Sequence, residues 1–197
     1  MHMKRSIVAL FFILFAAGSL SARAQVAPSA YSERFTINAG LLGSVFQPDY
    51  AGAAVAQTSP YRLYGEGAYV DVKLTRWVQI EAEARWLRFN SYLDIREDNY
   101  LIGPRLPINK LRFKRATPYA KALVGYGRMN FYLNSAYGRF TDIAYGGGVD
   151  VKLTKRITLR AIDFEYQQWL GWPDIPGSTN VSLSPYGGSV GVSYKIF

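Results

Sequence analysis

Two pairs of carboxylates are the side chains of this sequence best suited to chemistry. Glu81 and Glu83 lie two positions apart, and so do Asp163 and Glu165. Residues two apart on a β-strand share a face, with Cα atoms roughly 6.5–7 Å apart. Each pair could therefore act as a general acid and a general base in hydrolysis. Every alternating polar face contains such pairs, however. We therefore expect both pairs to belong to a structural network of charges.

The composition excludes most other catalytic chemistry. The chain has 197 residues, no cysteine and one histidine, His2, in a segment that we expect to be removed. Disulfides, thiolate nucleophiles and, in the mature chain, imidazole-based triads are therefore excluded. We expect no catalytic residue, no metal site and no cofactor.

The first 24 residues predict a secretory signal peptide. Lys4 and Arg5 precede an apolar run at residues 7–17, and small residues flank Arg23. A basic start, a short apolar run and an A-x-A site are typical of an export signal, here cut after Ala24. One domain, residues 25–197, then remains.

Eight segments in that domain alternate between apolar and polar positions, which predicts β-strands. In the third segment, Val78, Ile80 and Trp86 fall on one face, and Glu81 and Glu83 fall on the other. The eight segments are residues 34–46, 61–74, 77–89, 96–106, 117–129, 141–153, 157–169 and 185–197.

Alternation alone leaves open which face points inward, but two features favour an apolar outside. Small residues recur on the polar faces, which suits the crowded inside of a narrow barrel: Gly125, Gly127, Gly146, Gly148, Gly187 and Gly191. Aromatic residues recur near segment ends, as in the girdles of membrane barrels: Tyr61, Tyr64, Trp77, Trp86, Tyr100, Tyr119, Tyr126, Trp169, Trp172, Tyr186 and Tyr194. We therefore predict an all-β fold, an eight-stranded antiparallel up-and-down transmembrane β-barrel.

The lengths of the connections predict its orientation. Tight turns at residues 75–76 and 154–156 contrast with longer joins at 47–60, 130–140 and 170–184. Short turns face the periplasm in this architecture, and longer loops face outward. Residues 107–116 form either an unusually long periplasmic turn or extensions of the flanking strands.

A repeated hexapeptide supports this division into strands. Residues 70–75 (VDVKLT) recur as residues 149–154, each time leading into a tight turn. Continued past the turn, the alignment pairs Glu83 with Asp163 only if one residue is inserted near Ala161. This predicts a β-bulge at that point.

Two stretches resemble the small outer-membrane β-barrel superfamily, the group of OmpA-like transmembrane domains and OmpX-like barrels. They are the closing strand, residues 187–197 (GGSVGVSYKIF), and residues 100–105 (YLIGPR). The resemblance implies an outer-membrane location in a Gram-negative-type cell envelope. It also implies that Tyr194 and Phe197 form a signal for the barrel-assembly machinery.

In such a barrel the polar faces line the lumen, where acids and bases in near balance are expected to pair and to leave no continuous channel. The lumen network that we predict consists of Asp71, Lys73, Glu81, Glu83, Arg85, Arg105, Lys121, Asp142, Asp150, Lys152, Arg160, Asp163 and Glu165.

A second group of charges lies beside the tight turns. This basic periplasmic rim consists of Arg76, Lys110, Arg112, Lys114, Arg115, Lys155 and Arg156. It is either a solvated edge or a surface for lipid phosphates or an acidic partner. The residue types of two loops, 134–139 and 171–177, suit an extracellular ligand, whereas nucleic acid is a poor partner for an exported chain.

These observations favour a non-enzymatic barrel with a largely closed lumen that serves envelope integrity or loop-mediated interactions. Three alternatives remain at this stage: a small passive pore for water or ions, a lipid-modifying barrel enzyme, and a soluble periplasmic β-barrel ligand carrier.

Overall fold

The computed structural model describes residues 35–49, 62–90, 95–111, 113–130, 137–171 and 182–197. The predicted signal peptide, Tyr61, Arg112 and Trp172 lie outside the described residues. The strands are β1 Thr36–Gln47, β2 Leu63–Lys73, β3 Gln79–Phe89, β4 Arg96–Pro107, β5 Ala116–Asn130, β6 Tyr137–Lys152, β7 Ile157–Gly171, β8 Ser182–Leu183 and β9 Tyr186–Lys195, with a 3-10 helix at Asn109–Leu111.

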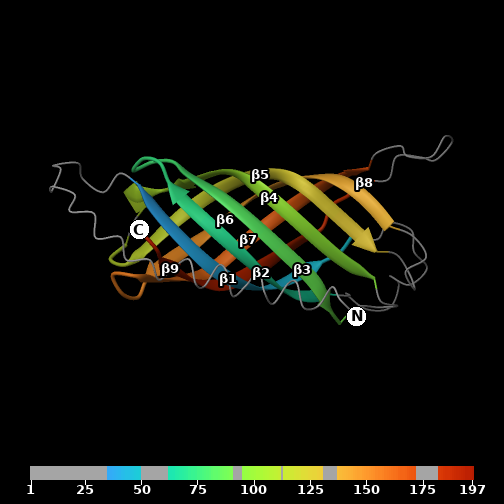
Figure 1. Cartoon of the computed structure of the whole chain (residues 1–197), viewed down its shortest axis with the longest axis horizontal. Coiled ribbons are helices and arrows are strands. Elements are labelled where there is room, and N and C mark those ends of the chain that lie inside the picture. The colour runs from blue at the N-terminus through green and yellow to red at the C-terminus, as the bar shows by residue number, and fades with distance from the viewer. Residues whose placement is uncertain (1–34, 50–61, 91–94, 112, 131–136, 172–181) are drawn as a thin grey trace, which may run out of the picture. The chain divides into compact units, whose positions relative to one another are not determined.

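The strands close into a barrel (Figure 1). Each of β1 to β7 pairs antiparallel with its sequence neighbour from β1–β2 through β6–β7, and β9 pairs with both β7 and β1. The two residues of β8 pair with β7 at Trp169 and Leu170, beyond the point where β9 pairs with Tyr166. β8 and β9 thus follow one line, and the predicted eight-stranded antiparallel barrel is confirmed.

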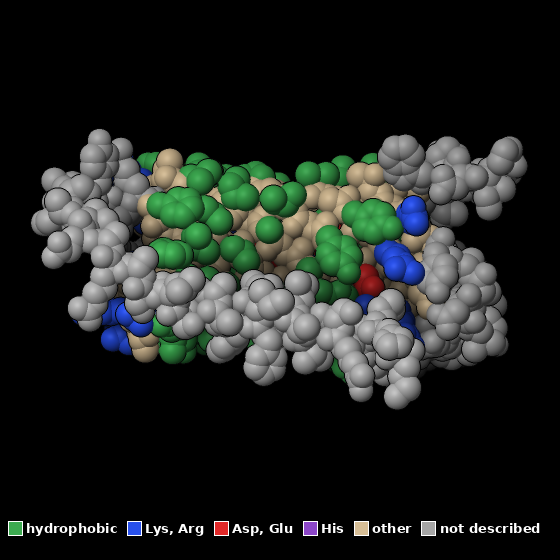
Figure 2. Space-filling model, viewed as in Figure 1, with side chains coloured by type: hydrophobic (Ala, Val, Ile, Leu, Met, Phe, Trp, Pro, Cys, Tyr) green, Lys and Arg blue, Asp and Glu red, His purple; other side chains and the backbone are tan. Residues whose placement is uncertain are grey.

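The barrel is apolar outside and charged inside. On the outer face, Ile102 and Val124 are 54% and 51% exposed, whereas Glu81 and Glu165 inside are 0% exposed. Figure 2 shows hydrophobic side chains spread along the visible face, with Lys and Arg side chains towards its two ends. A soluble carrier would have the opposite arrangement, so that alternative is wrong.

The repeated hexapeptide builds the same turn twice. The Thr75 hydroxyl accepts hydrogen bonds from the backbone N–H groups of Trp77 and Val78, at 3.1 and 3.0 Å. The Thr154 hydroxyl accepts the equivalent bonds from Arg156 and Ile157, at 3.1 and 2.9 Å. A threonine that satisfies two turn amides explains why each strand pair reverses so tightly at this sequence.

The predicted β-bulge is present. Val149 pairs with Ile162 and the next residue, Asp150, pairs with Arg160, so Ala161 has no partner on β6. The register on the β9 side shifts over the same residues. Because of this extra residue, Arg160 and Asp163 both point into the lumen, where each is 0% exposed.

Several predicted boundaries and positions need correction. β6 begins at Tyr137, so Arg139 belongs to a strand and not to an outer loop. Tyr119 and Trp169, expected in the aromatic girdle, are buried inside the barrel because they share the inward faces of Lys121 and Glu165. β4 ends at Pro107, and a 3-10 helix follows, so the connection to β5 is a long turn.

None of the helices in the described parts of the chain is long and apolar enough to cross a membrane.

Candidate functional site

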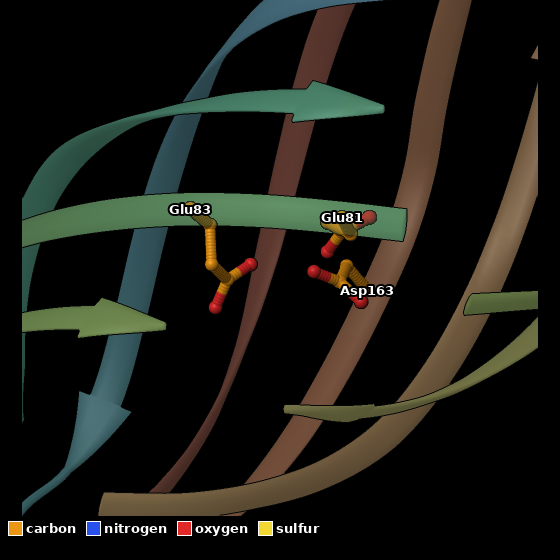
Figure 3. A group of neighbouring side chains, drawn as sticks. All are labelled: Glu81, Glu83 and Asp163. Carbon is orange, nitrogen blue, oxygen red and sulfur yellow. The ribbon is translucent and has the colours of Figure 1, made fainter. Parts of the chain in front are cut away.

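The lumen holds one ammonium group surrounded by carboxylates. Lys121 Nζ, on β5, lies 3.1 Å from Glu81, 3.0 Å from Glu83, 2.8 Å from Asp163 and 2.9 Å from Glu165. We call these five residues the Lys121 cluster. Figure 3 shows how carboxylates from two strands converge, Glu81 and Glu83 from β3 and Asp163 from β7. All five side chains are fully buried.

Arg85 joins the cluster on the side of the outer loops. Its guanidinium group binds both carboxylate oxygens of Glu165, at 2.5 and 3.0 Å, and lies 3.1 Å from Glu83. The two parallel bonds to Glu165 fix the orientation of the guanidinium plane as well as its position.

Two further arginines join the cluster on the side of the turns. Arg160 binds Glu81 at 2.6 Å and Asp71 at 3.2 Å. Arg105 lies 3.3 Å from Glu81 and binds Asp150 at 2.5 Å. Glu81 thus shares its charge with both arginines and with Lys121, which offsets much of the cost of burying it.

Two tyrosines that the sequence did not assign to the lumen support these arginines. The Tyr119 hydroxyl donates a 2.9 Å hydrogen bond to Asp163, and the Arg105 guanidinium lies 3.6 Å from the centre of the Tyr119 ring. Arg160 lies 3.8 Å from the centre of the Tyr69 ring. Stacking on an aromatic face stabilises a buried cation. The sequence did contain a signal for this position, because Tyr69 lies two residues from Asp71 and Tyr119 lies two residues from Lys121, and residues two apart on a strand share a face.

A layer of apolar and amide side chains covers the cluster on the side of the loops. Trp169 donates a 2.8 Å hydrogen bond to Gln167, which donates to Glu165 at 2.5 Å. Trp169 packs with three other buried apolar side chains, Met129, Phe140 and Leu183, and a second buried group consists of Phe46, Leu63 and Leu87.

Inner glycines make room for the large rings of this layer. A Cβ atom at Gly127 would lie 3.0 Å from the Trp169 ring, and one at Gly187 would lie 2.5 Å from the Phe46 ring. The small residues on the polar faces therefore serve close packing across the lumen.

The structure brings together eleven of the thirteen residues predicted for the lumen. Asp150 lies at the edge of the network with 17% of its side chain exposed, and the following ten are buried: Asp71, Glu81, Glu83, Arg85, Arg105, Lys121, Asp142, Arg160, Asp163 and Glu165. Lys73 is only half-buried and Lys152 is exposed. Both end their strands at the turns, where a long side chain reaches water.

The expected balance of charge is also wrong. With the buried Glu97, which the sequence did not assign, eight acids of the described chain line the lumen against four bases, Arg85, Arg105, Lys121 and Arg160. Neither carboxylate oxygen of Asp142 has a hydrogen-bond partner among the described residues, and its side chain is 0% exposed.

This geometry bears on both the metal and the catalytic interpretations. Oxygen atoms of Glu81, Glu83 and Asp163 lie within 4.8 Å of one another, close enough to hold a metal ion. Lys121 Nζ contacts all three, so an ammonium group already occupies the position between them. The carboxylates of both pairs are fully buried.

The remaining predicted residues lie at the turn end of the barrel. Six members of the basic rim are exposed: Arg76, Lys110, Lys114, Arg115, Lys155 and Arg156. Tyr194 faces outward from β9 and accepts a 2.9 Å hydrogen bond from the Arg156 side chain. Phe197, beyond the last strand, is 70% exposed.

Comparison with known families decides the affiliation of the chain. Residues 11–195 match the family described as outer membrane protein beta-barrel domain. The chain belongs to this family. Family membership implies an outer-membrane location and confirms the predicted likeness to OmpA-like small barrels. Among curated proteins, no sequence matches the chain significantly.

Solved structures agree on the fold. Neisserial surface protein A superposes with a TM-score of 0.56 at 12% identity, over 81% of this chain and 96% of that one. OprG of Pseudomonas aeruginosa superposes with a TM-score of 0.55 at 14% identity, over 82% of this chain and 95% of that one. The N-terminal β-barrel domain of OprF from the same organism superposes with a TM-score of 0.51 at 11% identity, over 82% of this chain and 97% of that one. At such identities the likeness shows the fold alone.

Proposed function

We propose that this protein is a closed, non-enzymatic outer-membrane barrel that contributes to envelope integrity and presents its outer loops at the cell surface. The observation that carries the proposal is the position of Lys121, whose ammonium group contacts four carboxylates in the middle of the lumen. A barrel whose centre is filled in this way offers no water-filled path.

The apolar layer supports the same function. Water or an ion entering from the loop side would have to pass the buried Trp169, Phe140 and Phe46 before it reached the charged cluster. On the turn side it would meet Arg105 bound to Asp150. A passive pore therefore requires two layers of packed side chains to open together.

Enzymatic activity on lipids is disfavoured because a lipid cannot reach the buried carboxylates. The carboxylates that sequence spacing singled out, Glu81, Glu83, Asp163 and Glu165, are fully buried and hold cations. Lipids reach only the outer face of the barrel, which is separated from these groups by the wall of strands.

Planar-bilayer recordings of the purified, folded protein test the proposal. We expect no unitary current steps in 1 M KCl, with a general-diffusion porin reconstituted in the same way as positive control. Steps of constant conductance that scale with salt concentration would favour the pore. In a parallel assay, release of fatty acid from phospholipid or lipopolysaccharide by the wild type would favour the enzyme.

A further inference from the structure

The turn end of the barrel carries a concentration of positive charge that the closed lumen does not explain. Nine of the eighteen described Lys and Arg residues lie there: Lys73, Arg76, Lys110, Lys114, Arg115, Lys152, Lys155, Arg156 and Lys195. We call them the turn-end cations. The connecting turns at 74–78, 108–115 and 153–156 contain no acidic residue.

Hydrogen bonds link the neighbouring turns that carry these cations. The Asn109 side chain donates to the carbonyl of Arg76 at 2.7 Å, and the Lys152 amide donates to the carbonyl of Arg115 at 3.0 Å. The Lys195 amide donates to the carbonyl of Arg156 at 2.7 Å. The three turns and the end of β9 are therefore linked into one surface, and the charged side chains of these turns are all basic.

Exposed apolar side chains are interleaved with the cations. Trp77 is 45% exposed with the Arg76 guanidinium 4.9 Å from its ring centre, and Phe113 is 70% exposed with Lys114 Nζ at 5.4 Å. Leu111 is 66% exposed in the same turn as Phe113. Aromatic and aliphatic groups beside Lys and Arg are typical of segments that lie at the boundary between acyl chains and headgroups.

We propose that the turn-end cations form a binding surface for the phosphates of anionic phospholipids in the leaflet that surrounds this end of the barrel. The apolar outer face of the strands ends directly at this surface, so the headgroups of the lipids that cover that face meet the cations. An acidic protein would be matched by the charge, but it would leave Trp77, Leu111 and Phe113 without the apolar environment that lipid supplies. Because the surface lies outside the lumen, this proposal does not depend on whether the lumen conducts.

Each cation near an anionic membrane surface favours binding by roughly five-fold at low ionic strength. We therefore expect a preference of about three-fold or more for phosphatidylglycerol over phosphatidylcholine in the lipid shell of the folded protein. Spin-labelled lipids of the two kinds, in vesicles that contain the full chain, measure this preference. In 0.5 M salt the preference should largely disappear, since salt screens exposed charges.

Two charge-matched variants test which end of the barrel causes the preference for phosphatidylglycerol. In the first, Arg76→Gln, Lys110→Gln, Arg115→Gln and Lys155→Gln remove four turn-end cations. In the second, Arg62→Gln, Arg96→Gln, Arg128→Gln and Arg139→Gln remove four exposed arginines near the loop end. Heat-dependent mobility on gels verifies that both variants fold.

The expected result is loss of the phosphatidylglycerol preference in the turn-end variant and its retention in the loop-end variant. Equal loss in both variants would overturn the proposal, because the preference would then follow from net charge alone. A wild type without any preference would also overturn it. Binding of soluble polyglutamate by that wild type, lost in the turn-end variant, would instead assign the surface to an acidic protein partner.

Discussion

At the scale of single residues, the ammonium group of Lys121 occupies the place that a metal ion would take among these carboxylates. Four carboxylate groups lie within 3.1 Å of one nitrogen atom, and all of them are buried. Removing one partner from a buried ion network leaves charges without compensation, which costs more than the network contributes as a whole.

We therefore predict that Lys121→Met lowers the free energy of unfolding by about 3–5 kcal/mol. Urea titration of the protein in lipid vesicles, followed by tryptophan fluorescence, measures the change. Lys110→Met, at an exposed turn position, serves as control and should stay within about 0.5 kcal/mol of the wild type. The double variant Lys121→Met, Glu83→Gln should recover part of the loss. A change below about 1 kcal/mol in Lys121→Met would contradict the central role of this residue.

At Asp142, by contrast, we expect a substitution to stabilise the protein. Its carboxylate is buried without a hydrogen-bond partner in the described part of the chain, so the neutral and nearly isosteric Asn should fit better. We expect Asp142→Asn to raise the free energy of unfolding by about 1–3 kcal/mol. As a matched control, Asp98→Asn removes the negative charge that the Arg88 side chain binds at 2.9 Å, and should lower stability by about 0.5 kcal/mol. Destabilisation by Asp142→Asn would show that the charged carboxylate has a favourable partner.

Sequence parity predicted most of the residues that line the lumen, because positions two apart on a strand share a face. The same rule places Tyr119 on the face of Lys121 and Trp169 on the face of Glu165. Both were nevertheless assigned to the aromatic girdle, because aromatic residues near strand ends are typical of it. The pairing of Lys121 with four particular carboxylates could not be predicted, because it depends on the stagger between strands that are distant in sequence.

At the scale of elements, the bulge at Ala161 shows how one residue sets the facing of a whole strand. Comparison of the two copies of the hexapeptide predicted it, since the charges that follow each copy match only with one insertion. By contrast, the two-residue β8 and the early start of β6 at Tyr137 gave no periodic signal, because short or extended strand ends contain too few alternating positions.

Deletion of Ala161 should be tolerated, because it removes the bulge without changing which side chains face inward. Ile162 would then follow Arg160 directly, opposite Val149, and Arg160, Asp163 and Glu165 would all stay in the lumen. Deletion of Phe164, an outward-facing residue in the regular part of β7, should instead turn Glu165 to the lipid face and take it away from Lys121 and Arg85. We expect the first variant to keep the heat-dependent gel mobility of a folded barrel and the second to lose it. Loss of this mobility on deletion of Ala161 would refute the assignment of register.

At the scale of the whole molecule, charge is separated into three regions. The lumen holds eight acids against four bases, the turn end of the described chain carries nine cations, and the wall between them is apolar outside. Family membership implies the membrane setting, whereas our proposals of a closed lumen and of a lipid-binding turn end rest on where individual side chains lie.

The arrangement with apolar side chains outside can be measured directly, because a chain without cysteine allows single labelling sites to be introduced. Nitroxide labels attached to Ile102→Cys and Val124→Cys, on paired positions of β4 and β5, should collide freely with oxygen in vesicles and be shielded from a water-soluble nickel chelate. A label at Leu101→Cys, which faces inward, should be shielded from both. Ready access of the nickel chelate to positions 102 and 124 would contradict the account, since these side chains would then face water and not lipid.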